Sequence, residues 1–173
     1  FAPTAEGLYG GVPTAPEVRW GALTDTYEGA FRAGHFDGVI RVVDLLFQAV
    51  RPNSAVFGAK DLQQVAVVRR MAQERHPQVA IVVGELVRDA RGLALSSRNV
   101  RLDDQGMEQA LALHEALSSI HAAGQALDAD GCWTEALDQA RKQLGEQVVL
   151  EYLDVVDVDT FEPQRKKGKG AAY

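Results

Sequence analysis

Two short apolar runs rich in β-branched residues, separated by a helical segment, constrain this fold more than any other feature of the sequence. Residues 54–58 and 78–84 have the pattern of buried strands, and residues 61–75 between them have the pattern of a helix. A strand, a helix and a strand joined by short connections predict a βαβ unit whose two strands run parallel. We therefore predict an α/β fold with a parallel sheet in its first part.

The pattern of expected helices and strands changes near residue 102, and we place a domain boundary there. Residues 1–102 are expected to form the parallel α/β part, and residues 103–173 a small α+β part. In the first part we also expect a buried helix over 36–50 and an irregular strand over 85–87 before a turn at 89–92. In the second part we expect a helix from Asp103 to about His121 closed by Gly124, a helix over 130–144 closed by Gly145, and a strand over 148–158.

Composition excludes several classes of function. The chain has 173 residues with 18 Lys+Arg against 24 Asp+Glu, a formal charge of −6, which argues against a duplex nucleic-acid binder. No apolar run approaches the ~20 residues that span a bilayer, so no membrane partner is expected. A single cysteine, Cys132, allows no internal disulfide and fits a reducing cytoplasm. No His/Cys set has metal-ligand spacing, and the basic run over 165–169 is expected to be solvated.

The junction after the first predicted strand has the features of an anion site. Gly58 permits a ligand to approach the backbone, and the helix beginning near Asp61 presents unpaired N–H groups at its positive end. Lys60 adds an ammonium group beside them, which makes phosphate the expected ligand. Each feature also has a structural explanation, since Asp61 and Gln64 have capping-box spacing and Lys60 suits a solvated loop.

A second polar cluster, residues 92–99, follows another predicted strand in the same part of the chain. Ser96, Ser97, Arg98 and Asn99 are consecutive, and together they can donate hydrogen bonds to several oxygens of one polyphosphate. The structural alternative is a loop of turn-forming residues that caps the next helix. Because both clusters follow strands, we expect the head groups of Lys60 and Arg98 to converge on one phosphate-sized volume.

A third segment, residues 28–38, places glycines around Arg32 and His35 just before the helix over 36–50. A turn followed by a helix start explains this pattern, and we prefer that explanation to a functional one.

These three segments resemble motifs of the pantothenate synthetase (pantoate–β-alanine ligase) family. Residues 57–64 resemble the family's Phe-Gly-Glu-Lys-Asp-aromatic-Gln-Gln segment, with Ala59 in place of Glu and Leu62 in place of the aromatic residue. Residues 92–99 match its Gly-Leu-Ala-(Leu/Met)-Ser-Ser-Arg-Asn stretch in order and spacing. Residues 28–38 resemble its Glu-Gly…Arg-Pro-Gly-His-Phe-x-Gly-Val segment, with Ala33 in place of Pro. The resemblance covers nearly the whole chain.

The resemblance implies a Rossmann-like nucleotidyltransferase sheet and a cytoplasmic, homodimeric ligase. Such an enzyme activates pantoate with ATP and Mg²⁺, releases pyrophosphate, and lets β-alanine attack the pantoyl adenylate to give pantothenate and AMP. Lys60, Ser96, Ser97 and Arg98 are the expected catalytic residues. The nucleotide would contact Gly58, Ala59, Lys60 on the phosphates, Asp61 near the ribose, Val87 on the adenine side, and Leu95, Ser96, Ser97 and Arg98 around the triphosphate; Gln64 would hold pantoate.

The family also has a nucleotide-binding half with a His-x-Gly-His motif, which is absent from these 173 residues. We therefore expect a carboxyl-terminal portion that holds half of a site and is inactive alone, with Mg²⁺ held by ATP phosphates and by residues outside this chain. Two alternatives stay open. One is a non-catalytic nucleotide-binding or assembly domain, and the other is a nucleotidyltransferase that uses a different acid.

Overall fold

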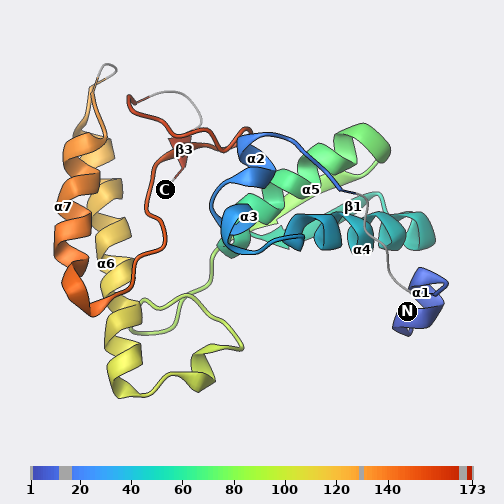
Figure 1. The fold of residues 1–173 in the computed structure, drawn as a ribbon, viewed down its shortest axis with the longest axis horizontal. Helices are drawn as coiled ribbons and strands as arrows, with labels where there is room; N and C mark the ends of the chain where they lie inside the picture. The colour runs from blue at the N-terminus through green and yellow to red at the C-terminus, as the bar shows by residue number, and fades with distance from the viewer. Residues whose placement is uncertain (1, 12–16, 129–130, 168–170, 173) are drawn as a thin grey trace. The chain divides into compact units, whose positions relative to one another are not determined.

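The computed structural model describes residues 2–11, 17–128, 131–167 and 171–172, and the chain divides into two compact units, Phe1–Glu85 and Leu86–Tyr173 (Figure 1). The division by packing therefore follows the second strand directly. The domain boundary expected near residue 102 stays a prediction.

The first unit contains the βαβ arrangement predicted from the sequence. Strand β1 (Ser54–Gly58) leads through a short 3-10 turn, η1 (Ala59–Asp61), into helix α5 (Leu62–Arg75), and the chain returns in strand β2 (Ala80–Gly84). The strands pair in parallel with Ser54 opposite Ala80 and Gly58 opposite Gly84. The predicted α/β class with a parallel sheet is confirmed.

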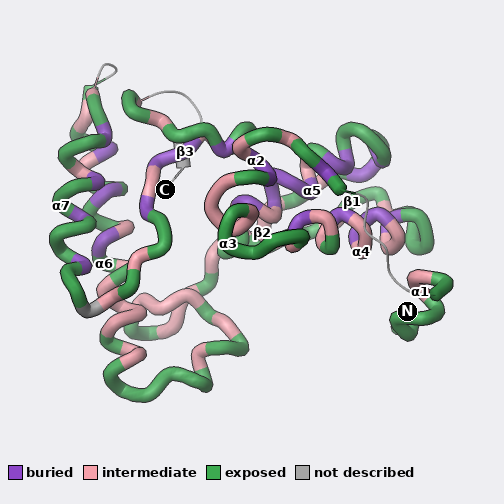
Figure 2. Tube along the Cα trace, viewed as in Figure 1, coloured by how far each residue is buried: buried purple, intermediate pink, exposed green. Residues whose placement is uncertain are grey.

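Helix α4 (His35–Val50) packs against α5 and supplies much of the core of the first unit (Figures 1 and 2). Its buried apolar residues recur at helical spacing, which places them on one face of the helix. They are Phe36, Ile40, Val43 and Phe47. Shorter helices precede it, namely α1 (Ala5–Tyr9), α2 (Ala22–Asp25) and α3 (Glu28–Phe31).

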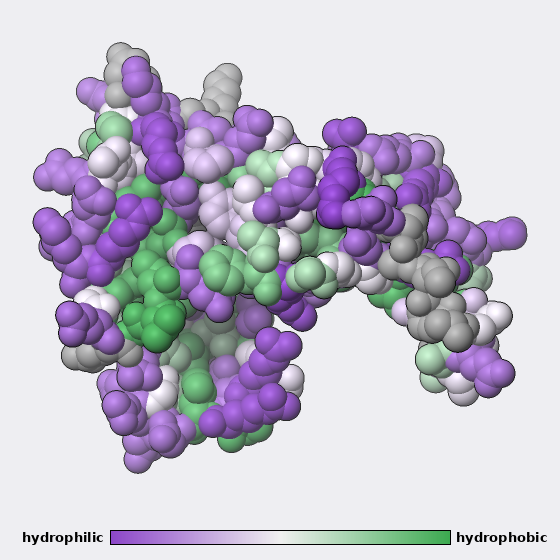
Figure 3. Space-filling view, in the orientation of Figure 1, coloured by the Kyte–Doolittle hydropathy of each residue, from purple (hydrophilic) through white to green (hydrophobic). Residues whose placement is uncertain are grey.

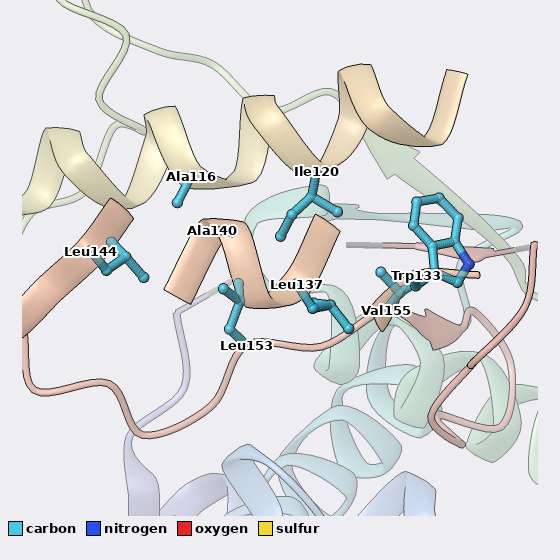
Figure 4. Close-up of a cluster of buried hydrophobic side chains, with 8 residues drawn as sticks. All are labelled: Ala116, Ile120, Trp133, Leu137, Ala140, Leu144, Leu153 and Val155. Atoms are coloured by element: carbon cyan, nitrogen blue, oxygen red, sulfur yellow. The ribbon is translucent and has the colours of Figure 1, made fainter. Parts of the chain in front are cut away.

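The second unit is built on two packed helices, α6 (Asp104–Ala126) and α7 (Thr134–Leu144). Between them and the following chain lies a buried cluster, Ala116, Ile120, Trp133, Leu137, Ala140, Leu144, Leu153 and Val155 (Figure 4). The prediction that Gly124 closes the first of these helices is wrong, since α6 continues past it. Gly124 is buried against Trp133, and a Cβ at this position would come within 2.3 Å of the indole. The close packing of the indole therefore requires a glycine here.

Several predicted elements of the second unit differ from the structure. The strand expected over 148–158 is reduced to β3 (Val156–Asp157), which pairs antiparallel with β4 (Ala171–Ala172). No strand forms over 85–87; instead the Leu95 N–H donates to the Val87 carbonyl at 2.9 Å across the predicted turn. Helix α7 begins at Thr134, and residue 130 of the predicted helix lies outside the described residues. Two further 3-10 turns are η2 (Asn99–Arg101) and η3 (Gly145–Gln147).

The basic run is only partly solvated, in contrast to the prediction. Lys167 donates from its Nζ to the Leu127 carbonyl at 2.7 Å and from its backbone N–H to the Gly131 carbonyl at 2.8 Å. Residues 168 and 169 of this run lie outside the described residues.

The surface is mostly hydrophilic on the face that Figure 3 shows, with an apolar area over the second unit. In the first unit, Val56 and Val82 stand opposite each other on the sheet and are 70% and 47% exposed. Among the described residues, no helix is both long and apolar enough to cross a membrane.

Candidate functional site

The end of β1 and the start of α5 form the predicted anion site. Gly58 is extended, and apart from its chain neighbours no heavy atom lies within 4 Å of the place where its Cβ would stand, so the backbone is open to a ligand there. Lys60 is 44% exposed, and its Nζ lies 3.4 Å from the Asp61 carboxylate, which is 60% exposed. An accessible cation therefore stands at the positive end of a helix dipole, which favours an anionic ligand.

The capping box offered as an alternative for Asp61 and Gln64 does not form. Asp61 occupies the N-cap position of α5 but accepts no capping hydrogen bond, and its carboxylate is instead paired with Lys60. Gln64, the third residue of α5, is half-buried. Helix capping therefore does not explain these two side chains.

Gln63, between these residues, is a polar contact that the sequence pattern did not indicate. Its side chain is buried, donates from Nε2 to the carbonyls of Leu23 (3.2 Å) and Thr26 (2.9 Å), and accepts at Oε1 from the Glu28 N–H (3.1 Å). A partner separated by more than 30 residues leaves no periodic signal in one sequence, so only the tertiary structure reveals these bonds.

The segment over 28–38 has the local structure we preferred for it. Helix α3 is followed by Gly34 in a left-handed conformation (φ 71°), and α4 begins directly afterwards at His35. Arg32 pairs with Glu28 at 3.2 Å. Burial and the nearby Arg32 guanidinium lower the pKa of His35, while the Glu28 and Asp61 carboxylates act in the opposite direction. His35 is thus within electrostatic range of Asp61 at the start of α5.

The second polar cluster lies in the second unit, on a loop that folds back on itself. Arg88 forms a bridge with Ala94, and its guanidinium donates to the Gly92 carbonyl at 2.9 Å. The Asp89 carboxylate accepts from the backbone N–H groups of residues 91 and 93, each at 2.9 Å, which fixes the turn. Val87 at the base of this loop is 61% exposed.

Within this loop, some polar side chains serve the turn and others face solvent. The Ser96 hydroxyl accepts from the Arg98 N–H at 3.2 Å, and the Asn99 amide donates to the Ala94 carbonyl at 3.0 Å, as the turn explanation expects. Ser97 and Arg98 are exposed, and Leu95 is 53% exposed. Among the described residues, the Arg98 guanidinium forms no ion pair, so it is available to an anionic ligand.

The sequence motifs are thus distributed over both units. Residues 28–35 and 58–64 meet in the first unit through Gln63 and through the charges around His35. Val87 and residues 95–98 belong to the second unit. The convergence of Lys60 and Arg98 on one phosphate-sized volume stays a prediction.

The chain matches a known protein family over its whole length. The family model described as pantoate-beta-alanine ligase matches residues 1–173. The chain belongs to this family. The pantothenate synthetase of Acidothermus cellulolyticus is 44% identical over 165 residues, 94% of this chain and 52% of the relative. That of Corynebacterium glutamicum is 46% identical and matches 94% of this chain and 57% of its own length.

Solved structures of pantoate–β-alanine ligases have the same fold. The pantothenate synthetase of Thermus thermophilus matches 99% of this chain and 62% of its own, with a TM-score of 0.88 and 40% identity. A Francisella tularensis pantoate-beta-alanine ligase, described as complexed with beta-gamma ATP and beta-alanine, matches 80% of this chain and 50% of its own, with a TM-score of 0.60 and 28% identity. The chain spans about half the length of the curated relatives it matches.

Proposed function

We propose that this chain supplies part of the active site of an ATP-dependent ligase that condenses pantoate with β-alanine. The observation that carries the proposal is the match to the Thermus thermophilus pantothenate synthetase over 99% of the chain. The open Gly58 backbone and the exposed Lys60 at the start of α5 support it chemically, because they suit a phosphate.

In the proposed reaction, a carboxylate oxygen of pantoate attacks the α-phosphorus of ATP. The bond from this phosphorus to the bridging oxygen breaks, pyrophosphate leaves, and pantoyl adenylate forms. The amine of β-alanine then attacks the acyl carbon, loses a proton, and expels AMP to give pantothenate. Little covalent chemistry falls to the protein in such a transfer, so its task is to orient the reactants and stabilise the developing charge.

The roles proposed for residues follow their positions. Residues 58–61 would line the nucleotide, with Lys60 on the phosphates and Asp61 at the ribose, and Gln64 would hold pantoate. Val87 would contact the adenine side. Residues 95–98 would surround the triphosphate, where the exposed Arg98 guanidinium, which has no ion pair among the described residues, suits a bidentate phosphate contact.

Magnesium, location and assembly belong to the same proposal. The described residues bring together no three His, Cys, Asp or Glu side chains that could hold a metal ion. We propose that Mg²⁺ arrives bound to the ATP phosphates. Resemblance to the family supports a cytoplasmic homodimer, and the single Cys132 agrees with a reducing compartment.

The test compares this chain alone with a completed enzyme. By "completed enzyme" we mean this chain co-expressed with the part of the Thermus thermophilus synthetase that has no counterpart here. We expect pantothenate from pantoate, β-alanine and ATP with the completed enzyme and none with the chain alone. Other hydroxy acids offered in place of pantoate test the alternative acid substrate. Turnover by the chain alone would contradict the half-site proposal.

Lys60→Ala in the completed enzyme tests the anion site itself. A cation on developing charge acts mainly in the transition state, so kcat should fall on the order of 100-fold while KM for ATP rises less. Lys142→Ala, on α7, is the charge-matched control and should leave both constants unchanged. Equal activity of the Lys60 variant would remove this residue from the site.

A further inference from the structure

Gln63 is more deeply buried than its neighbours at the start of α5. It is 6% exposed, whereas Asp61 is exposed and Gln64 half-buried. A glutamine is seldom buried to this extent unless its amide is fully hydrogen-bonded. Its three bonds all go to main-chain groups of residues 23–28, which lie 35 to 40 positions earlier in the chain.

Only a carboxamide of this length satisfies that environment. Nε2 must donate to two carbonyls, those of Leu23 and Thr26, while Oε1 must accept from the Glu28 N–H. A glutamate in the same place has the right shape but no donor, and its charge would face two carbonyl oxygens. A methionine has the right length and neither group.

The backbone that Gln63 holds is strained at one residue. Tyr27, between the bonded Thr26 carbonyl and the bonded Glu28 N–H, has φ 49°, in the region that non-glycine residues seldom adopt. Gly29 presses so close to α2 that a Cβ would stand 1.9 Å from the Thr24 carbonyl oxygen. Such a conformation persists only where its surroundings determine it, and Gln63 bonds both sides of the strained residue.

The held segment carries charges that act at the start of α5. Glu28 pairs with Arg32, and both influence His35, as does Asp61 from the α5 side. The hydrogen bonds of Gln63 therefore set the position of residues 28–35 relative to Lys60 and Asp61.

We propose that Gln63 is a positioning residue: its amide clamps the strained backbone of residues 26–28 and so fixes the Glu28–Arg32–His35 segment beside the Lys60–Asp61 pair. The inference rests on the proposed function, because Lys60 and Asp61 are there the nucleotide contacts. Gln63 would thus act on the nucleotide through other residues and not by touching it.

The first test begins with the unaltered chain. In the 173-residue chain, NMR hydrogen exchange should find the Glu28 N–H protected although it is the first residue of a four-residue helix, where such groups otherwise exchange freely. In Gln63→Met, the exchange of this N–H should accelerate about tenfold or more, the effect of losing the bond to Oε1. Gln73→Met, an exposed position on the same helix, should change nothing.

The second test separates positioning from simple stabilisation. When the segment loosens in Gln63→Met, His35 loses burial, so its pKa should rise toward its ordinary value of 6.5, as followed by NMR titration. In the completed enzyme, the same variant should raise KM for ATP several-fold. Gln63→Glu provides a second variant: it keeps an acceptor for the Glu28 N–H but cannot donate to the Leu23 and Thr26 carbonyls, so the exchange of this N–H should accelerate less than in Gln63→Met.

Two results would overturn the proposal. One is a rapidly exchanging Glu28 N–H in the unaltered chain. The other is a Gln63→Met variant that melts earlier but keeps the wild-type His35 pKa and KM for ATP, which is the behaviour of a merely structural residue. If Lys60→Ala were also without effect in the completed enzyme, the proposed function would fail; if Lys60→Ala alone impaired it, only the role of Gln63 would fail.

Discussion

Replacing Gly124 by alanine tests the packing of the second unit, because two effects of opposite sign meet at this position. Gly124 lies inside α6, and in a helix interior alanine is more favourable than glycine by about 1 kcal/mol. If only helix propensity mattered, Gly124→Ala would stabilise the protein. The structure predicts the opposite result.

The added methyl group has no space. Its carbon would stand 2.3 Å from Cη2 and 2.6 Å from Cζ3 of Trp133, well inside van der Waals contact. Trp133 is 2% exposed and belongs to the buried cluster with Ile120, Leu137 and Val155, so its rigid ring cannot turn aside without displacing them (Figure 4). Overpacking of this kind costs roughly 1–3 kcal/mol, and a clash this close belongs at or above the upper end.

Subtracting the propensity gain from that upper end leaves a net loss of about 2 kcal/mol or more. For a unit of this size, a loss of about 2 kcal/mol corresponds to a fall in melting temperature of roughly 8–16 °C. Urea unfolding followed by Trp133 fluorescence, in a Trp20→Phe background, reports the second unit directly. Gly38→Ala on α4 is the matched control, followed by Trp20 fluorescence in a Trp133→Phe background because Gly38 lies in the first unit. Its added Cβ has open space, so helix propensity alone should stabilise this variant.

A double variant refines the test. Trp133→Phe removes ring atoms that the methyl group would strike, so Gly124→Ala should cost less in that background than in the wild type. A Gly124→Ala protein as stable as the wild type, or more stable, would refute the packing argument.

The other predictions concern the site, pH and association. Gln64→Glu in the completed enzyme should raise KM for pantoate roughly tenfold, through charge repulsion and mismatched hydrogen bonds, with unfolding free energy changed by less than about 0.5 kcal/mol; unaltered pantoate kinetics would remove Gln64 from the site. Burial raises the pKa of Asp44, but the hydrogen bond with His76 at 2.6 Å and the other partners outweigh it, so the pKa lies below the ordinary 3.8. The stability it contributes is therefore full above pH 3.8 and lost as pH falls through the folded pKa, and urea unfolding should show a shallower acid limb in Asp44→Asn. The open sheet face with Val56 and Val82 should make the chain alone associate, as mass in solution by light scattering would show, and Val56→Thr should reduce this association; a well-behaved monomer would contradict it.

The parts of the fold that depend on neighbours in sequence were predictable. Strand β1 occupies the predicted residues, and α4 and α5 begin within one residue of prediction, because buried runs and helical periodicity are local signals. The strand expected over 148–158 was wrong for a related reason. Its apolar residues pack against the helices of the second unit with little ladder pairing, and apolar pattern alone does not distinguish these two uses.

The residues of the candidate site likewise fall into those that a local motif predicts and those that only folding brings into contact. Lys60, Asp61 and Gln64 follow from a junction motif that one sequence displays, whereas Gln63 adjoins them without any pattern of its own. Capping-box spacing at Asp61 and Gln64 suggested a bond that the structure replaces with an ion pair to Lys60. Spacing states which contacts are possible, and the competition among partners decides which of them form.

The sequence by itself determined the βαβ unit, the presence of the four longer helices, and the motifs that place the chain in its family, because each rests on residues close together along the chain. Only the tertiary structure decided that Gly124 is a packing contact and that Gln63 clamps a strained turn more than 30 residues away. The physical reason is that steric fit and buried hydrogen bonds depend on atoms brought together by folding. A single sequence does not show which of its distant residues these atoms will contact after folding.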